Sequence, residues 1–116
     1  MNWDEIKTEV EQNGNVLTIS MEELRNAAGA SRLGVNVRDD ISSTLAGMGL
    51  GHVPVELPAY YYEPVRLYKR GTAVGKMIDT MLEPGEQNDR QLVDRLGEDG
   101  LDYAVIVERI RDLVNE

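Results

Sequence analysis

The residues that could perform covalent or metal chemistry are few in this chain. It has no Cys and one His, His52, so a cysteine-type zinc finger, a disulfide framework and a thiol nucleophile are excluded. A Ser-His-acid triad would have to use His52, which lies beside Gly51 at the edge of an expected strand. Carboxylates are abundant, but no pair stands out. We therefore expect a protein that is not an enzyme and needs no metal or cofactor.

Two glycine-rich stretches are similar to nucleotide-binding loops but do not meet their requirements. Residues 71–76 are one residue short of a phosphate-binding loop, and Met77 stands where Ser or Thr must hold magnesium. Residues 47–51 lack the spacing of the dinucleotide fingerprint and precede a strand instead of a helix. We expect the first stretch to begin a helix and neither to bind a nucleotide.

The charges are distributed unevenly along the chain. The net charge of −9 argues against nucleic acid, because affinity for phosphates comes mostly from cations. Residues 24–76, however, hold seven Lys or Arg against four Asp or Glu, whereas both ends are acidic. A basic middle is compatible with a nucleic-acid-binding face, and acidic ends are equally ordinary for solvated helices.

Residues 20–50 predict two short helices joined by a turn. Ser20 and Glu23 have the spacing of a capping box at the start of the first helix, and Gly29 supplies a left-handed stop. Asn36 is expected to cap the second helix, 36–48. The buried stripe of that helix should be Val37, Ile41, Leu45 and Met48. Two such helices, the second with a small polar outer face, are typical of a helix-turn-helix.

The other elements follow from hydrophobic periodicity and from turn residues. We expect helices over 2–12, 72–82, 88–96 and 101–114, and strands over 15–20, 52–57 and 64–70. Pro54 cannot donate to a ladder, so the 52–57 strand should either lie at a sheet edge or have the amide position of Pro54 facing away from a neighbouring strand. In the last strand, Leu67 and Tyr68 should face opposite sides of the sheet. The 88–96 helix should bury Leu92, Val93 and Leu96 and end at Gly97.

The chain shows no sign of membrane insertion or export. No apolar run approaches the roughly 18 residues that span a bilayer. The first residues, with Asp4 and Glu5, are not the basic start of a signal peptide. We expect a cytoplasmic protein of a single domain that does not contact a membrane.

The order helix, strand, helix, helix, strand, strand over residues 2–70 is similar to the winged helix-turn-helix domains of bacterial transcription regulators. The resemblance implies an α+β fold, with a winged core over 1–71 and a helical extension over 72–116. It also implies that helix 36–48 enters the major groove of double-stranded DNA and that a wing over 52–70 contacts the backbone. The implied DNA-binding residues are Arg32, Asn36, Arg38, Ser42, Ser43, Arg66, Lys69 and Arg70. One departure is that Asp39 and Asp40 follow Arg38.

Two function hypotheses follow. The first is a small DNA-binding transcriptional regulator. The second is a winged-helix protein-interaction module, an adaptor or inhibitor that does not bind DNA, and the overall acidity favours it. Tyr60, Tyr61 and Tyr62 are its candidate partner-binding residues, of which at least one should pack on the core. The apolar stripe of 101–114 predicts either a homodimer contact or packing onto 72–82.

Overall fold

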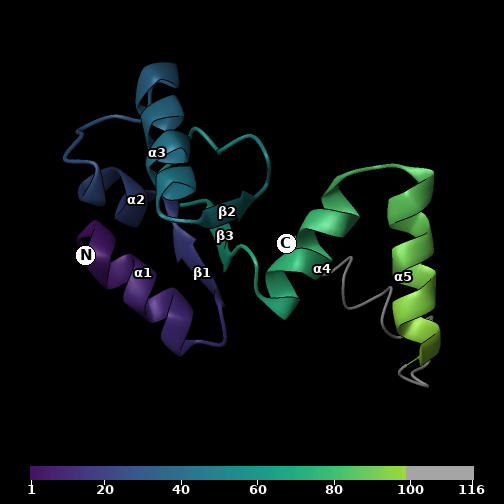
Figure 1. Cartoon of the computed structure of the whole chain (residues 1–116). Coiled ribbons are helices and arrows are strands. Elements are labelled where there is room, and N and C mark those ends of the chain that lie inside the picture. The colour runs from purple at the N-terminus through teal and green to yellow at the C-terminus, as the bar shows by residue number, and fades with distance from the viewer. Residues whose placement is uncertain (99–116) are drawn as a thin grey trace.

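The computed structural model describes residues 1–98, with side chains described to residue 94. This part of the chain is α+β, as expected, with five helices and a three-stranded antiparallel sheet (Figure 1). In chain order the elements are α1 (Trp3–Gln12), β1 (Val16–Ser20), α2 (Met21–Ala27), α3 (Val35–Gly47), β2 (Leu50–Val53), β3 (Pro64–Lys69), α4 (Ala73–Leu82) and α5 (Glu86–Glu98). None of these helices is long and apolar enough to cross a membrane.

The sheet has the order β1-β3-β2, so the last strand in the chain is central and pairs with both others. Leu67 of β3 lies opposite Leu17 of β1 and His52 of β2. The edge position expected for β2 is confirmed, but its expected range of 52–57 is wrong. The strand ends at Val53 because Pro54 has no N–H with which to continue the ladder.

The main core lies between α1, α2 and α3 and one face of the sheet. Ile41 and Leu45 of α3 are fully buried there, and Val37 and Met48 pack against them, as the spacing predicts. The buried residues of this core are Ile6, Val10, Ile19, Met21, Leu24, Ile41, Leu45, Leu50, Leu57, Val65 and Leu67. Because the core joins all three helices to the sheet, it fixes the position of α3.

The opposite face of the sheet is covered by α4, on the other side of the sheet from α1–α3 (Figure 1). Tyr68 is 1% exposed and packs with Val53 and Ile78. The expectation that Leu67 and Tyr68 face opposite sides is therefore confirmed. The Tyr68 ring lies directly on Gly51, where a Cβ would overlap it. A residue without a side chain is thus required at Gly51 for Tyr68 to occupy this position.

The start of α3 differs from the prediction. The expected capping residue, Asn36, lies in the first turn, and the N-cap is Gly34, which makes no side-chain capping bond. The helix preceding it begins as expected, because the Ser20 hydroxyl accepts from the Glu23 amide at 3.4 Å. Gly29 has the left-handed φ of +69° that ends such a helix.

The helices after the sheet are confirmed in part. Thr72 caps α4 by accepting from the amide of Gly75 at 3.1 Å. α5 is longer than the expected 88–96 and continues through Gly97, a residue that costs a helix only about 1 kcal/mol. The expectation that Val93 is buried is wrong, since it is 53% exposed. The segment 101–114, and with it the predicted homodimer contact, lies outside the described residues.

Candidate interaction surfaces

The solvent-facing side of α3 carries negative charge. Asn36, Asp39, Asp40 and Ser43 are all exposed on it. Arg32 is exposed in the turn that precedes the helix. Two carboxylates on the face that would enter a DNA groove repel phosphates, so this face is poorly suited to nucleic acid.

Arg38, the only cation in α3, does not extend from this face. Its guanidinium is half-buried and donates from Nη1 to the carbonyl of Leu57 at 3.4 Å. Its Nε atom is buried and has no hydrogen-bond partner among the described residues. The Arg38 side chain therefore lies against the 54–63 loop, which connects β2 to β3.

Ser42 is also turned away from the solvent-facing side of α3. Its hydroxyl lies 2.8 Å from His52 Nε2, and His52 Nδ1 lies 2.8 Å from the carbonyl oxygen of Pro54. A carbonyl oxygen only accepts, so Nδ1 must donate to it, and in the neutral ring Nε2 then accepts from Ser42. The Ser-His pair thus has a carbonyl where a catalytic triad has a carboxylate. Its role is to fasten α3 to the start of the loop.

The three cations predicted to form a phosphate-binding wing do not lie on one face. Lys69 forms an ion pair with Glu11 of α1 at 2.7 Å, and this contact lowers the pKa of the Glu11 carboxyl. Arg66 is half-buried and makes contacts of its own. Because side chains alternate along a strand, Arg66 and Lys69 point to opposite sides of the sheet. Arg70 follows the strand and is exposed.

The three neighbouring tyrosines form an exposed aromatic cluster on the 54–63 loop. Tyr60, Tyr61 and Tyr62 are 61%, 54% and 66% exposed. The rings of Tyr60 and Tyr62 are stacked with centroids 5.7 Å apart, and Tyr61 meets Tyr62 edge-on at 5.6 Å. The expectation that one of them packs on the core is wrong, because Leu57 anchors the loop instead. We call these three residues the tyrosine cluster.

Backbone hydrogen bonds hold the tyrosine cluster against the start of α2. The first amides of a helix have no partner within the helix. Here the Met21 amide donates to the carbonyl of Glu63 and the Glu22 amide to the carbonyl of Tyr61, each at 2.9 Å. Leu57 is only 6% exposed and sits in the main core. The loop is therefore pinned at several points while its aromatic side chains face solvent.

The surroundings of the tyrosine cluster are acidic. Glu22 and Glu23 lie in the first turn of α2, beside the carbonyls of the loop. Glu56 and Glu63 are in the loop itself. These carboxylates make the surface repel phosphates and attract cations.

A pocket of about 420 Å³ lies where α3, β2 and α4 meet, and we call it the junction pocket. Its polar side chains are Ser42, His52, Tyr68, Arg70, Asp79 and Glu83. The Tyr68 hydroxyl donates to Asp79 Oδ1 at 2.7 Å. Burial, followed by this hydrogen bond to Asp79, raises the pKa of Tyr68 to about 12, although the positive charge of the Arg70 guanidinium in the same pocket opposes the increase.

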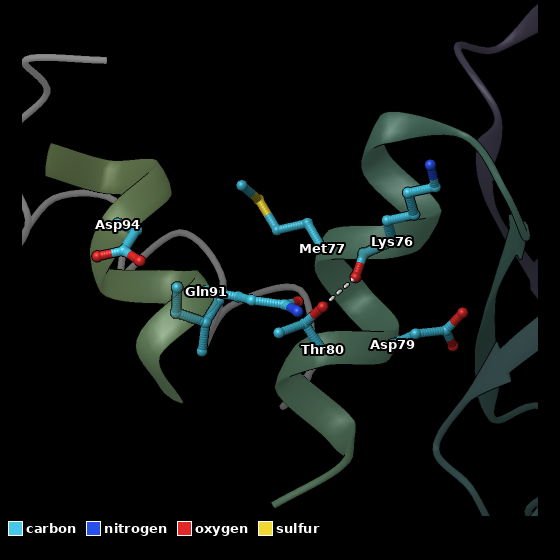
Figure 2. Close-up of a pocket in the computed structure, with 7 residues that line it drawn as sticks. Lys76, Met77, Asp79, Thr80, Gln91 and Asp94 are labelled. Carbon is cyan, nitrogen blue, oxygen red and sulfur yellow. Dashed lines mark hydrogen bonds between the residues drawn. The ribbon is translucent and has the colours of Figure 1, made fainter. Parts of the chain in front are cut away.

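A second pocket, of about 400 Å³, lies between α4 and α5. Figure 2 shows Thr80 facing Gln91 across it, whereas Asp79 points from α4 away from α5. The Thr80 hydroxyl donates to the carbonyl of Lys76 at 2.6 Å, within its own helix. This pocket therefore offers few polar groups that converge on a common point, in contrast to the junction pocket.

The sequence analysis missed the junction pocket. The one sequence feature that indicates this pocket is Asp79, a carboxylate beside Ile78 in an otherwise apolar helical stripe. A carboxylate at such a position is expected to have a polar partner on the element packed against the helix. The tyrosine cluster, by contrast, was named from the sequence.

Comparison of the chain with protein-family models, with curated proteins and with solved structures finds no match.

Proposed function

We propose that the chain is a winged helix-turn-helix module that binds another protein through the tyrosine cluster. The observation that most directly supports this proposal is that three adjacent tyrosines are exposed on a loop whose backbone is held against the core. The winged assignment is supported by the element order and by the sheet order β1-β3-β2. In this proposal the module is a binding unit and not an enzyme.

Exposed tyrosines on a fixed loop favour association with a protein. Tyrosine is enriched at interfaces because it contributes a large contact area and a hydroxyl at low entropic cost. The bonds from Met21 and Glu22, and the burial of Leu57, already order the loop backbone. A surface that is ordered before binding loses less conformational entropy in the complex.

The partner surface in this proposal is basic. Arg and Lys side chains can lie over tyrosine rings and interact with nearby carboxylates at the same time. Glu63 follows the tyrosines directly in the loop, and Glu22 lies where the start of α2 is bonded to the Tyr61 carbonyl, so these two residues supply carboxylates near the cluster. Binding should therefore weaken as the salt concentration rises, because complementary charges at the rim of an interface are screened.

A DNA-binding regulator is the second proposal. It is supported by the helix-turn-helix arrangement of α2 and α3, by the basic 24–76 segment and by the exposed Arg32 and Arg70. The acidic outer face of α3 and the engagement of Arg38 and Lys69 within the protein weigh against it. For this reason we place the protein-binding proposal first.

The test is affinity capture with the full chain as bait, in parallel with a labelled random duplex. The baits are the wild type, the Tyr60→Ser, Tyr62→Ser double variant and a Val93→Ser control, which changes an apolar residue on α5 that is also more than half exposed. We expect the wild type and the control to retain the same discrete partner and the double variant to lose it. Retention by all three baits, or duplex binding that requires Arg32 and falls steeply with salt, would overturn the proposal.

A further inference from the structure

We propose that a groove between α3 and the 54–63 loop binds a lysine side chain of the protein partner. The inference rests on the proposed function for the nature of the partner, and it names a second contact and the residue type that makes it. The groove has a volume of about 370 Å³. One stripe of α3, at positions 35, 38, 39 and 42, faces residues 55–57 of the loop across it. We call it the loop groove.

Exposed apolar side chains gather around the loop groove and the tyrosine cluster. Seven large apolar side chains are exposed in the described part of the chain, and five of them lie at the start of α3 or on the 54–63 loop. Two of the five, Val35 and Val55, are 62% and 68% exposed and line the groove from α3 and from the loop. Because apolar residues gathered on one surface are typical of a binding site, we expect this groove to be covered by a partner.

The charge at the loop groove selects a basic side chain. Asp39 on α3 and Glu56 on the loop are both exposed, and neither forms an ion pair with another of the described residues. An acidic side chain would be repelled by both carboxylates, and an apolar one would leave them without a partner. A cation between α3 and the loop can interact with both.

Lysine combines the two properties that the groove requires. Its four-carbon stem is apolar and can pack against Val35 and Val55 while the charged end remains in water. The ammonium group has three N–H donors, so it can serve carboxylates that belong to two different elements. A lysine side chain therefore matches both the valines and the carboxylates of the groove.

The other polar side chains of the groove are engaged within the protein. The half-buried Arg38 donates from Nη1 to the carbonyl of Leu57 at 3.4 Å, so its guanidinium ties the loop to α3. The Ser42 hydroxyl lies 2.8 Å from His52 Nε2. The lining thus holds one half-buried cation and two exposed carboxylates, and the charge that it presents to a partner is negative.

The probe is a single lysine blocked at both ends, Nα-acetyl-L-lysine N-methylamide, titrated into the full chain while backbone amide signals are followed by NMR. We expect saturable shifts at residues 35–39 and 55–57, with a Kd of about 10 mM or below. The norleucine analogue keeps the four-carbon stem without the ammonium group, and the glutamate analogue reverses the charge. Each analogue should bind at least about fivefold more weakly, because the contacts with the two carboxylates are lost.

Matched variants separate contact with these two carboxylates from a general effect of net charge. The Asp39→Asn, Glu56→Gln double variant should bind the lysine probe at least about fivefold more weakly. The Asp40→Asn, Glu9→Gln double variant removes the same two charges from exposed positions outside the groove and should keep the Kd within about twofold. All four residues are exposed, so both proteins are expected to fold.

The proposal fails if the folded wild type shows no saturable shifts at about 50 mM of the lysine probe, a concentration well above the expected Kd. It also fails if either analogue binds as well as the lysine probe, since the carboxylates are then not recognised. Shifts that lie outside the groove, or that persist unchanged in the Asp39→Asn, Glu56→Gln protein, would overturn it as well.

The lysine titration is independent of the tyrosine cluster. The Tyr60→Ser, Tyr62→Ser protein should bind the lysine probe as the wild type does, because neither tyrosine lines the groove, and loss of binding would overturn this inference. A partner captured only when the tyrosines are present, together with no lysine binding, would overturn this inference and leave the proposed function standing. Lysine binding at the groove without a tyrosine-dependent partner would support the groove and overturn the proposed function alone.

Discussion

Replacing Tyr68 by Phe removes one hydroxyl group from the junction between α4 and the sheet. The ring still fills the space over Gly51, while the hydrogen bond to Asp79 Oδ1 at 2.7 Å is lost. Hydrogen bonds to charged groups contribute about 1.5–3 kcal/mol, and Asp79 is half-buried and can be partly rehydrated. We therefore expect the free energy of unfolding near pH 8 to fall by about 1–2 kcal/mol.

The same hydroxyl makes the stability depend on alkaline pH. The pKa of Tyr68 is raised from 10.0 to about 12, so the folded protein keeps a proton that the unfolded chain releases at lower pH. The stabilisation is fully present below about pH 10 and is lost as the pH rises toward about 12. Two pKa units correspond to at most about 2.7 kcal/mol, which solvent access at the pocket reduces to about 1–2 kcal/mol.

The assay is urea unfolding of the wild type and of Tyr68→Phe at several pH values between about 8 and 12. The difference in the free energy of unfolding between the two proteins should be largest near pH 8 and should become smaller above pH 10. Comparing the two proteins cancels the titration of lysines and other tyrosines. Tyr61→Phe, which alters an exposed tyrosine, is the control and should behave like the wild type. Parallel pH profiles for the wild type and Tyr68→Phe would refute this account of the hydroxyl.

The remaining predictions concern the elements around the two surfaces. Gly51→Ala places a Cβ into the Tyr68 ring and should cost about 1–3 kcal/mol in urea unfolding, whereas Gly34→Ala, with open space around it, should cost less than about 1 kcal/mol. Leu57→Ala removes the buried anchor of the 54–63 loop and should cost about 2–5 kcal/mol. The same change should increase chymotrypsin cleavage at the tyrosine cluster, and unchanged cleavage would show that the backbone bonds to α2 suffice. Lys69→Ala should leave duplex binding unchanged, because this cation is already paired with Glu11; a marked loss would contradict that view.

The fold class was predictable because the apolar residues follow the periods of helices and strands. The spacing of Ile41 and Leu45 identifies the buried side of α3, and the alternation of Leu67 and Tyr68 identifies β3. The start of α3 was predicted wrongly because more than one residue near a helix end can serve as its cap. Gly34 caps α3 without a side-chain bond, although Asn36 is the better capping residue by type.

The candidate site was harder to predict because its residues are engaged by partners distant in the sequence. Lys69 meets Glu11, and Arg38 meets the carbonyl of Leu57. No pattern of neighbouring residues reveals such pairs, so sequence reasoning alone predicts that both cations are available for DNA. The tyrosine cluster could be predicted from the sequence because three consecutive tyrosines are conspicuous whichever secondary structure contains them. That all three are exposed depends on Leu57 taking the buried position of the loop, which only the tertiary structure reveals.

The most direct test of the central claim is site-specific photo-crosslinking in the source organism. A benzophenone amino acid replaces Tyr61 in one protein and Val93 in a control, two positions of nearly equal exposure. If the tyrosine cluster binds a protein, position 61 should cross-link to one discrete partner with a basic contact segment, and position 93 should not. Cross-links from position 61 to DNA alone, or the same products from both positions, would contradict the proposed function.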